Sequence, residues 1–379
     1  EPGDTETRNA LNILAGQLGR DGEWARHLAV ALQQLKDKNS SSDVRVVATE
    51  LAKLSGERLA DKATAERAWL AVLAVDAEAV DAFEALTAMY RADQRWTDLR
   101  ALLERRAEVT MDNNVRRHVL LELAALEEDV LGQSGFAMAA HRRVLELDAG
   151  YVPSYQALDR LYAAGQQWTE LEELLARQLD AAESPRDHVL LNYRRAELFA
   201  NQLKQPSRAV DLLEDVVARQ RSHSEARTLL EKLLPTPEVT IDAARSATLR
   251  DAAESHLAMR VARLLEPLYE EDKQWRELVQ VLRVQRGLVT GTEAVELLSR
   301  IATIEETELA QPRYAFDAWI EVLSLDPTHE RARVEISRLA DITAVVIQPG
   351  SGDALQFLKA GLMEVFDLLV VNKADLGEL

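Results

Sequence analysis

The segment that decides the fold is AALEEDVLGQSGFAMAAHRRVLELD, residues 124–148, because its spacing of small and apolar residues occurs four times. In each copy an Ala is followed by a Leu seven residues later, a second Ala six residues after that, and a Val seven residues further on. The copies begin at Ala52, Ala124, Ala196 and Ala302, and the same period is followed by Trp24, Trp96, Trp168 and Trp275. Self-similarity at a fixed period predicts a repeat architecture in which each unit buries its apolar face against its neighbours.

The repeats are expected to be helical hairpins. Apolar residues recur at spacings of three and four from Asp4 to about residue 340, which predicts helices throughout this part. Each period of 72 residues holds two hairpins of about 36 residues, so we expect about nine hairpins and a single helix near residues 328–340. The repeated Ala sites mark the closest approach of paired helices, because only small side chains let helix axes come within about 8 Å.

One interval breaks the period. From Trp168 to Trp275 the spacing exceeds 72 by 35 residues, which is the length of one hairpin. The interval contains Pro235-Thr236-Pro237, which is a strong helix stop, so an extra hairpin is expected near residues 235–270. The chain is therefore divided into an all-α superhelix over residues 1–340 and a short segment of different character over residues 341–379.

Aromatic residues accompany the period. A Tyr stands six residues before three of the repeated Trp, at Tyr90, Tyr162 and Tyr269, whereas Leu18 takes that place before Trp24. Such pairs could form a ligand cage, but aromatic residues at regular repeat positions are more often core. We interpret them as bridges across the turn between paired helices.

The composition of the chain limits the classes of partner that it can bind. The net charge is -19 and the pI about 4.9, so no clustered positive surface is expected and nucleic acid is a poor partner. The chain has no Cys, and no apolar run approaches the ~20 residues that span a bilayer. We expect a cytoplasmic protein without membrane contact. Because the first residue is Glu1 rather than Met, we expect the chain to be part of a longer one.

Titratable residues offer little sign of catalysis. The seven His are scattered and no metal site is expected; they are His27, His118, His141, His188, His223, His256 and His329. The acidic runs Glu127-Glu128-Asp129 and Glu305-Glu306 could bind a cation, but we interpret them as solvated helix faces.

The hairpin length, the Ala sites and the endings LELD (145–148) and LSLDP (323–327) resemble tetratricopeptide repeats over roughly residues 5–340. Ala65, Ala137 and Ala315 match that family's small second-helix site and Pro327 its closing Pro, while Asp159 and Leu171 depart from its pattern. The resemblance implies a right-handed superhelix whose concave face binds peptides or other proteins. Candidate groove residues on first helices are Gln156, Arg160, Glu122 and Arg194.

The pattern changes at Asp341. The apolar β-branched run 342–347 and the run 367–371 predict two buried strands, and Asp353 can cap a helix between them. This order predicts one βαβ unit, whose ligands lie at the carboxyl ends of the strands. Asn372, Lys373 and Asp375 follow the second strand there, in the Asn-Lys-x-Asp pattern with which many GTPases read guanine.

The stretch PGSGDALQFLKAGLMEVFDLLVVNKAD (349–375) resembles the GTPases associated with methylmalonyl-CoA mutase, the MeaB/ArgK type. The resemblance implies a GTP-dependent chaperone of a cobalamin-dependent mutase. A phosphate-binding loop requires Gly-x-x-x-x-Gly-Lys-Ser/Thr, and no Gly-Lys pair occurs in the chain. We therefore expect no GTP hydrolysis and no cofactor; GTP or GDP with Mg²⁺ would be expected only if the GTPase domain were complete.

Three functions stay open at this point. The first is a non-enzymatic scaffold that binds protein partners on the concave face of the superhelix. The second is a GTPase-linked protein whose phosphate-binding half is supplied by further sequence or by another chain. The third is a gene fusion in which residues 341–379 are inert.

Overall fold

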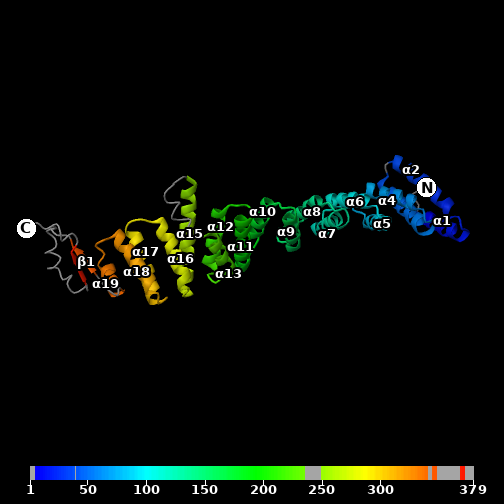
Figure 1. The fold of residues 1–379 in the computed structure, drawn as a ribbon. Helices are drawn as coiled ribbons and strands as arrows, with labels where there is room; N and C mark the ends of the chain where they lie inside the picture. Colours follow the sequence, from blue (N-terminus) through cyan, green and yellow to red (C-terminus); the bar gives the residue numbers. More distant parts are fainter. Residues whose placement is uncertain (1–4, 39, 235–248, 340–343, 348–367, 372–379) are drawn as a thin grey trace, which may run out of the picture. The chain divides into compact units, whose positions relative to one another are not determined.

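The structure is a computed structural model that describes residues 5–38, 40–234, 249–339, 344–347 and 368–371. Contacts divide the chain into two units, Glu1–Ala182 and Glu183–Leu379. The described part of the first unit is helical, and the second unit adds two short strands to its helices (Figure 1). None of the helices in these ranges is long and apolar enough to cross a membrane.

The first unit holds ten α-helices among its described residues. They are α1 (Thr5–Leu18), α2 (Asp21–Asp37), α3 (Ser41–Lys53), α4 (Lys62–Val75), α5 (Val80–Ala92), α6 (Trp96–Val109), α7 (Asn113–Ala125), α8 (Ser134–Leu147), α9 (Val152–Ala164) and α10 (Trp168–Asp180). Two π-helical turns, η1 (Leu54–Arg58) and η2 (Leu126–Val130), continue α3 and α7.

The second unit follows the same plan. Its helices are α11 (Pro185–Asn201), α12 (Pro206–Arg219), α13 (Ser224–Leu233), α15 (Leu249–Glu271), α16 (Trp275–Leu288), α17 (Thr292–Thr307), α18 (Pro312–Leu325) and α19 (Glu330–Leu339). Its strands are β1 (Ala344–Ile347) and β2 (Leu368–Val371).

Successive helices pack as hairpins. Close pairs include α3 with α4, α7 with α8, α11 with α12, α15 with α16, and α17 with α18. The last pair, α17 and α18, lies side by side in Figure 1. Extensive contacts between described elements join near neighbours along the chain, as expected of a repeat array. The repeated Trp marks the start of a second helix at Trp96, Trp168 and Trp275, and α19 lies where a single final helix was predicted.

The repeated small residues lie where the helices of a hairpin meet. All eight repeated Ala are at most 1% exposed, and the four repeated Val are fully buried. The repeated Leu, at Leu59, Leu131, Leu203 and Leu309, are half-buried beside the turn. Close contact at Ala and filling by Val therefore hold each hairpin, as the spacing predicted.

The turns also repeat. The residue two before the repeated Trp has a positive φ at Gln94, Gln166 and Lys273, with values of 55°, 53° and 56°. A second turn has a positive φ eight residues after the first repeated Ala, at Ala60, Gly132, Lys204 and Ala310. The second turn has a left-handed residue in all four copies, and only one of these residues is glycine. The packing of the helices therefore determines the turn conformation, because residues other than glycine adopt it as well.

The aromatic pairs belong to the core rather than to a ligand cage. Tyr90, Tyr162 and Tyr269 are each at most 5% exposed, and the Trp residues that follow them are half-buried. The Tyr90 hydroxyl donates a hydrogen bond of 3.0 Å to Glu66, and the Tyr269 hydroxyl donates one of 2.7 Å to Glu231. Burial and the Glu66 carboxylate raise the pKa of Tyr90 to about 12.

The C-terminal strands lie within the two predicted strand segments. β1 pairs with β2 in parallel, with Ala344 opposite Leu368 and Ile347 opposite Val371. The helix predicted between them lies outside the described residues, so the βαβ unit stays a prediction. Residues 235–248 also lie outside, and the extra hairpin near 235–270 stays a prediction, as does the division of the chain at residue 340.

Candidate partner surface and a repeated site beside a buried carboxylate

The predicted groove residues of the first unit lie on first helices, and two of them take part in ion pairs between neighbouring hairpins. Glu122 of α7 is half-buried and pairs with Arg91 of α5. Arg160 of α9 is exposed and pairs with Glu128 of η2, with Nη2 lying 3.0 Å from Oε2. Gln156 lies one helical turn before Arg160 and is exposed. Arg160 beside Glu128 lowers the pKa of that carboxyl.

The second unit has the same kind of contact. Arg300 of α17 pairs with Glu266 and with Glu270 of α15, the latter at 3.0 Å, and Arg338 of α19 pairs with Glu306 of α17. Arg194 of α11 is half-buried in this unit. We call the surface that carries these pairs in each unit the first-helix surface. Its charges are partly solvated, so each pair adds only about 0–1 kcal/mol to stability.

Two glutamates that the sequence interpretation placed on solvated faces are buried. Glu127 is fully buried and Glu305 is 6% exposed, so that interpretation is wrong for both. They stand three residues after the first repeated Ala, and Ser55 and Phe199 occupy the same position in the other two copies. In all four copies the carbonyl at this position accepts a hydrogen bond from the backbone N–H six residues later. The four aligned residues are Ser, Glu, Phe and Glu, so the sequence carries no clear signal that this position faces the core.

In the second copy the buried carboxylate is matched by an arginine from the preceding hairpin. Nε of Arg100 in α6 lies 2.6 Å from Oε1 of Glu127, and the guanidinium carbon lies 4.0 Å from the centre of the Phe136 ring in α8. Burial raises the pKa of the Glu127 carboxyl, and Arg100 opposes this. The arginine thus lies between a carboxylate and an aromatic face, an arrangement that favours a guanidinium group.

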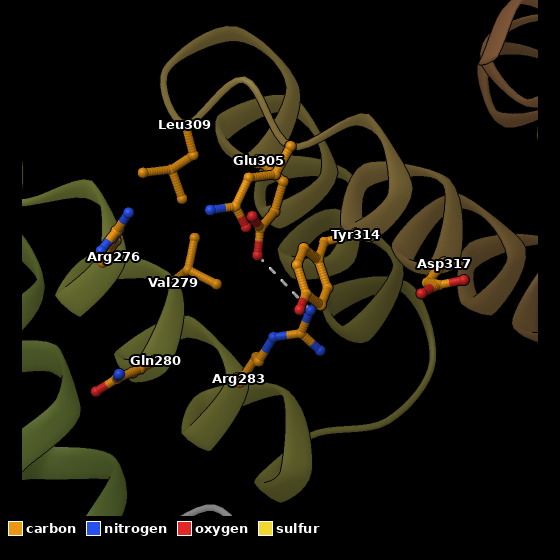
Figure 2. A pocket seen from close by; sticks show the side chains of 9 residues that line it. Arg276, Val279, Gln280, Arg283, Glu305, Leu309, Tyr314 and Asp317 are labelled. Carbon is orange, nitrogen blue, oxygen red and sulfur yellow. Dashed lines mark ion pairs between the residues drawn. The ribbon is translucent and has the colours of Figure 1, made fainter.

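In the fourth copy the corresponding place is a cavity of about 460 Å³ (Figure 2). The position of Arg100 is taken by Val279, and that of Phe136 by Tyr314, which is 54% exposed. Arg283, one turn further along α16, reaches Glu305 only at 3.9 Å, from Nη2 to Oε1. Oε2 of Glu305 is buried and has no hydrogen-bond partner among the described residues. Burial raises the pKa of Glu305, and Arg283 partly offsets the effect.

The first copy has a cavity at the same place without the carboxylate. It has a volume of about 620 Å³ and lies between α2, the end of α3 and α4, with Leu51, Leu59 and Thr64 in its wall. Ser55 stands at the position of Glu305 and is fully buried. The groove between successive second helices is therefore hollow in both the first and the fourth copy, and the residue three after the repeated Ala lines it in the fourth. None of the four predicted groove residues lines either cavity.

Two of the scattered histidines have structural tasks. Nδ1 of His223 accepts a hydrogen bond from the backbone N–H of Ala226 at the start of α13, and Nδ1 of His329 does the same for Ala332 at the start of α19. Across the described ranges there is no group of three His, Asp or Glu side chains placed to hold a metal ion. The guanine-reading residues Asn372, Lys373 and Asp375 lie outside the described residues.

Comparison with known proteins separates the two parts of the chain. Residues 329–378 match the model of the family described as methylmalonyl Co-A mutase-associated GTPase MeaB. Proteins named as GTPases in Pyrococcus abyssi and Pyrococcus horikoshii are 49% identical over 45 residues and 55% identical over 42 residues. These stretches cover 12% and 11% of this chain, and only 14% and 13% of the two relatives.

The helical part is similar to solved repeat structures at low identity. YrrB, described as a TPR protein with an unusual peptide-binding site, is 16% identical with a TM-score of 0.26, and the match covers 52% of this chain and 95% of YrrB. The C-terminal part of a TPR repeat-containing protein from Cytophaga hutchinsonii is 12% identical with a TM-score of 0.29, covering 82% of this chain and 99% of that one. The comparisons thus name the same two families that the sequence resembles. The fold described above is taken from the helices of this chain and not from these structures.

Proposed function

We propose that the helical repeats form a non-enzymatic scaffold that binds partner proteins or peptides. The observation that carries the proposal is the first-helix surface, on which ion pairs join neighbouring hairpins within each unit. These pairs hold charged side chains in a fixed arrangement before a partner arrives, which reduces the ordering cost of binding. Because each pair is partly solvated, a partner can exchange it for its own charges at small cost.

The scaffold is tested by capture of partners from a native lysate, followed by mass spectrometry. Three variants are made: the double variant Gln156→Ala/Arg160→Ala, and the single variants Glu122→Ala and Arg194→Ala. Each is expected to reduce the amount of captured partner at least several-fold. Arg20→Ala is the control, because it removes an exposed ion pair with Glu23 beside α2. Unchanged capture by all of the groove variants would show that the first-helix surface is not the binding surface.

The second candidate function is a GTPase-linked one, favoured by the family match over residues 329–378 and by the parallel pairing of β1 and β2. In this proposal Asn372, Lys373 and Asp375 read guanine once a phosphate-binding half is supplied, and a cobalamin-dependent mutase is the partner. Asp375 would accept hydrogen bonds from the guanine ring, which adenine cannot donate. GTP, GDP and Mg²⁺ enter only in that completed form.

One comparison separates the candidates. Residues 1–379 and residues 1–340 are used side by side in the same capture experiment. A mutase or a phosphate-loop protein held only by the longer chain would favour the GTPase-linked function. The same partners on both chains would favour the scaffold and leave residues 341–379 as the inert end of a gene fusion.

A further inference from the structure

The second and fourth copies contain equivalent sites that differ in one residue from the preceding hairpin, Arg100 in the second copy and Val279 in the fourth. In the second copy the guanidinium of Arg100 fills the space between Glu127 and the Phe136 ring. In the fourth copy Glu305 and Tyr314 stand at the same positions, but Val279 replaces the arginine. The shorter side chain leaves the cavity of about 460 Å³ beside a buried carboxylate.

We propose that this cavity binds the guanidinium group of an arginine side chain presented by a segment of a partner protein. The inference rests on the scaffold function proposed above and adds a second binding site to it, in the groove between α16 and α18. In the second copy the equivalent site is filled by the side chain of Arg100, while the backbone of α6 stays outside it. That observation points to a peptide arginine as the ligand.

The lining of the cavity suits such a side chain. Figure 2 shows Val279 and Leu309 beside the Glu305 carboxylate, with the Tyr314 ring on the other side. The aliphatic stem of an arginine can pack on the two apolar residues while its planar head lies against the ring. The head can approach the Glu305 carboxylate, whose side chain is 7% exposed.

The neighbouring charges leave room for a further cation. Arg283 faces Glu305 from α16 and reaches only Oε1, at 3.9 Å, which is beyond hydrogen-bond distance. A carboxylate offers about four acceptor sites, so Glu305 can accept from a ligand while Arg283 stays. Arg276 is a second cation in the wall, whereas Asp317 on α18 points away from the other labelled side chains (Figure 2). The net charge of -19 favours the approach of a cationic segment.

The test is a titration of the full chain with N-acetyl-arginine N-methylamide, followed by NMR of the methyl groups of Val279 and Leu309. Saturable shifts of both residues are expected, with a Kd on the order of 1 mM for one side chain. The citrulline analogue has the same shape without the charge, so it should bind at least about tenfold more weakly. No shift with the arginine probe, or equal binding of citrulline, would overturn the proposal.

Three variants locate the site. Glu305→Gln should remove saturable binding, and Tyr314→Ala, at an exposed position that leaves the core intact, should weaken it several-fold. Val279→Arg should place an internal arginine in the cavity, as in the second copy, and also abolish binding. Retained binding by Glu305→Gln would contradict the proposal, even if Val279→Arg failed to fold.

A last arm uses free L-arginine, which carries the same guanidinium group. Binding of the capped probe equal to or tighter than that of free arginine supports a chain-borne ligand. Tighter binding of the free amino acid would show that a metabolite is the ligand and would overturn the assignment to a partner segment. Because no partner is needed in this titration, its failure leaves capture on the first-helix surface untouched, and the two proposals fail separately.

Discussion

At the scale of the residue, one repeat position carries different chemistry in different copies. Ser55, Glu127 and Glu305 stand at equivalent places, and all three are buried. The cavity in the copy with Ser55 is lined by charged side chains, Arg26, Lys36, Asp61 and Arg67 among them. Glu127 has the Arg100 guanidinium at 2.6 Å, whereas Glu305 has the Arg283 guanidinium at 3.9 Å. Burying a charge with incomplete partners is costly, and that cost marks Glu305 as a residue with a use beyond packing.

The cost should appear in the pH dependence of stability. Burial raises the pKa of Glu305 above its ordinary 4.5, so between that value and its folded pKa the folded state holds a proton that the unfolded state has lost. The contribution of Glu305 to the free energy of unfolding therefore falls as pH rises through this window. Glu305→Gln should gain stability relative to the native chain as pH rises, measured by urea unfolding from pH 4.5 upward.

Glu308→Gln is the control for this series, because Glu308 is exposed at the end of the same helix. It shows what the loss of an exposed carboxylate does to stability over the same pH range. A difference that stays constant with pH for Glu305→Gln would mean that the Glu305 carboxyl keeps its ordinary pKa in the folded state.

At the scale of the element, the second copy shows how three elements are joined by one side chain. Arg100 of α6 reaches Glu127 in η2 and stacks on Phe136 of α8, so the second helix of one hairpin is attached to both parts of the next. Glu104, one turn later on α6, also contacts Arg100 at 3.3 Å. The π-helical turn that continues α7 places Glu127 between these helices.

Removal of this arginine should destabilise the first unit. Arg100→Met leaves Glu127 buried without its cation and should cost on the order of 2 kcal/mol, less than for a fully buried pair because Arg100 is 28% exposed. The double variant Arg100→Met/Glu127→Gln should recover much of the loss, since no charge is left buried. Chemical unfolding of the single and double variants checks this, and equal losses in both would mean that the charge of Glu127 is of no consequence.

At the scale of the whole molecule, stability is distributed over the repeats. One cluster of buried apolar residues runs from α2 to α8 in the first unit, and another runs from α11 to α19 in the second. Within each unit, contacts between the described elements pass from hairpin to hairpin. In such arrays stability is close to a sum of local and nearest-neighbour terms.

Equivalent core substitutions should therefore act on their own unit. Leu103 and Leu282 each stand seven residues after a repeated Trp, and both are fully buried. Leu103→Ala and Leu282→Ala should each cost about 2–5 kcal/mol. Hydrogen exchange should quicken in residues 5–180 for the first variant and in residues 185–339 for the second. Exchange that quickened across both units for either variant would show one cooperative array.

The sequence by itself determined the repeat, the hairpins and the sites of closest helix packing. A period of 72 residues fixes which residues are equivalent, and buried Ala at each copy follows from the distance between helix axes. It also indicated two strands near the C-terminus, because β-branched apolar runs differ from the helical pattern. Residues 372–375 and the four groove positions were likewise chosen from sequence, and they stay predictions.

Only the tertiary structure decided what became of the charges. Whether Glu127 and Glu305 faced water depended on the π-helical or α-helical end of the first helix and on the helix packed over it, and neither is a local property of an acidic run. Whether the space beside them was filled depended on one residue in the preceding hairpin, Arg100 or Val279. The sequence period shows which residues are equivalent. Whether a buried carboxylate has a cationic partner depends on side chains from three helices, which come together only in the folded chain.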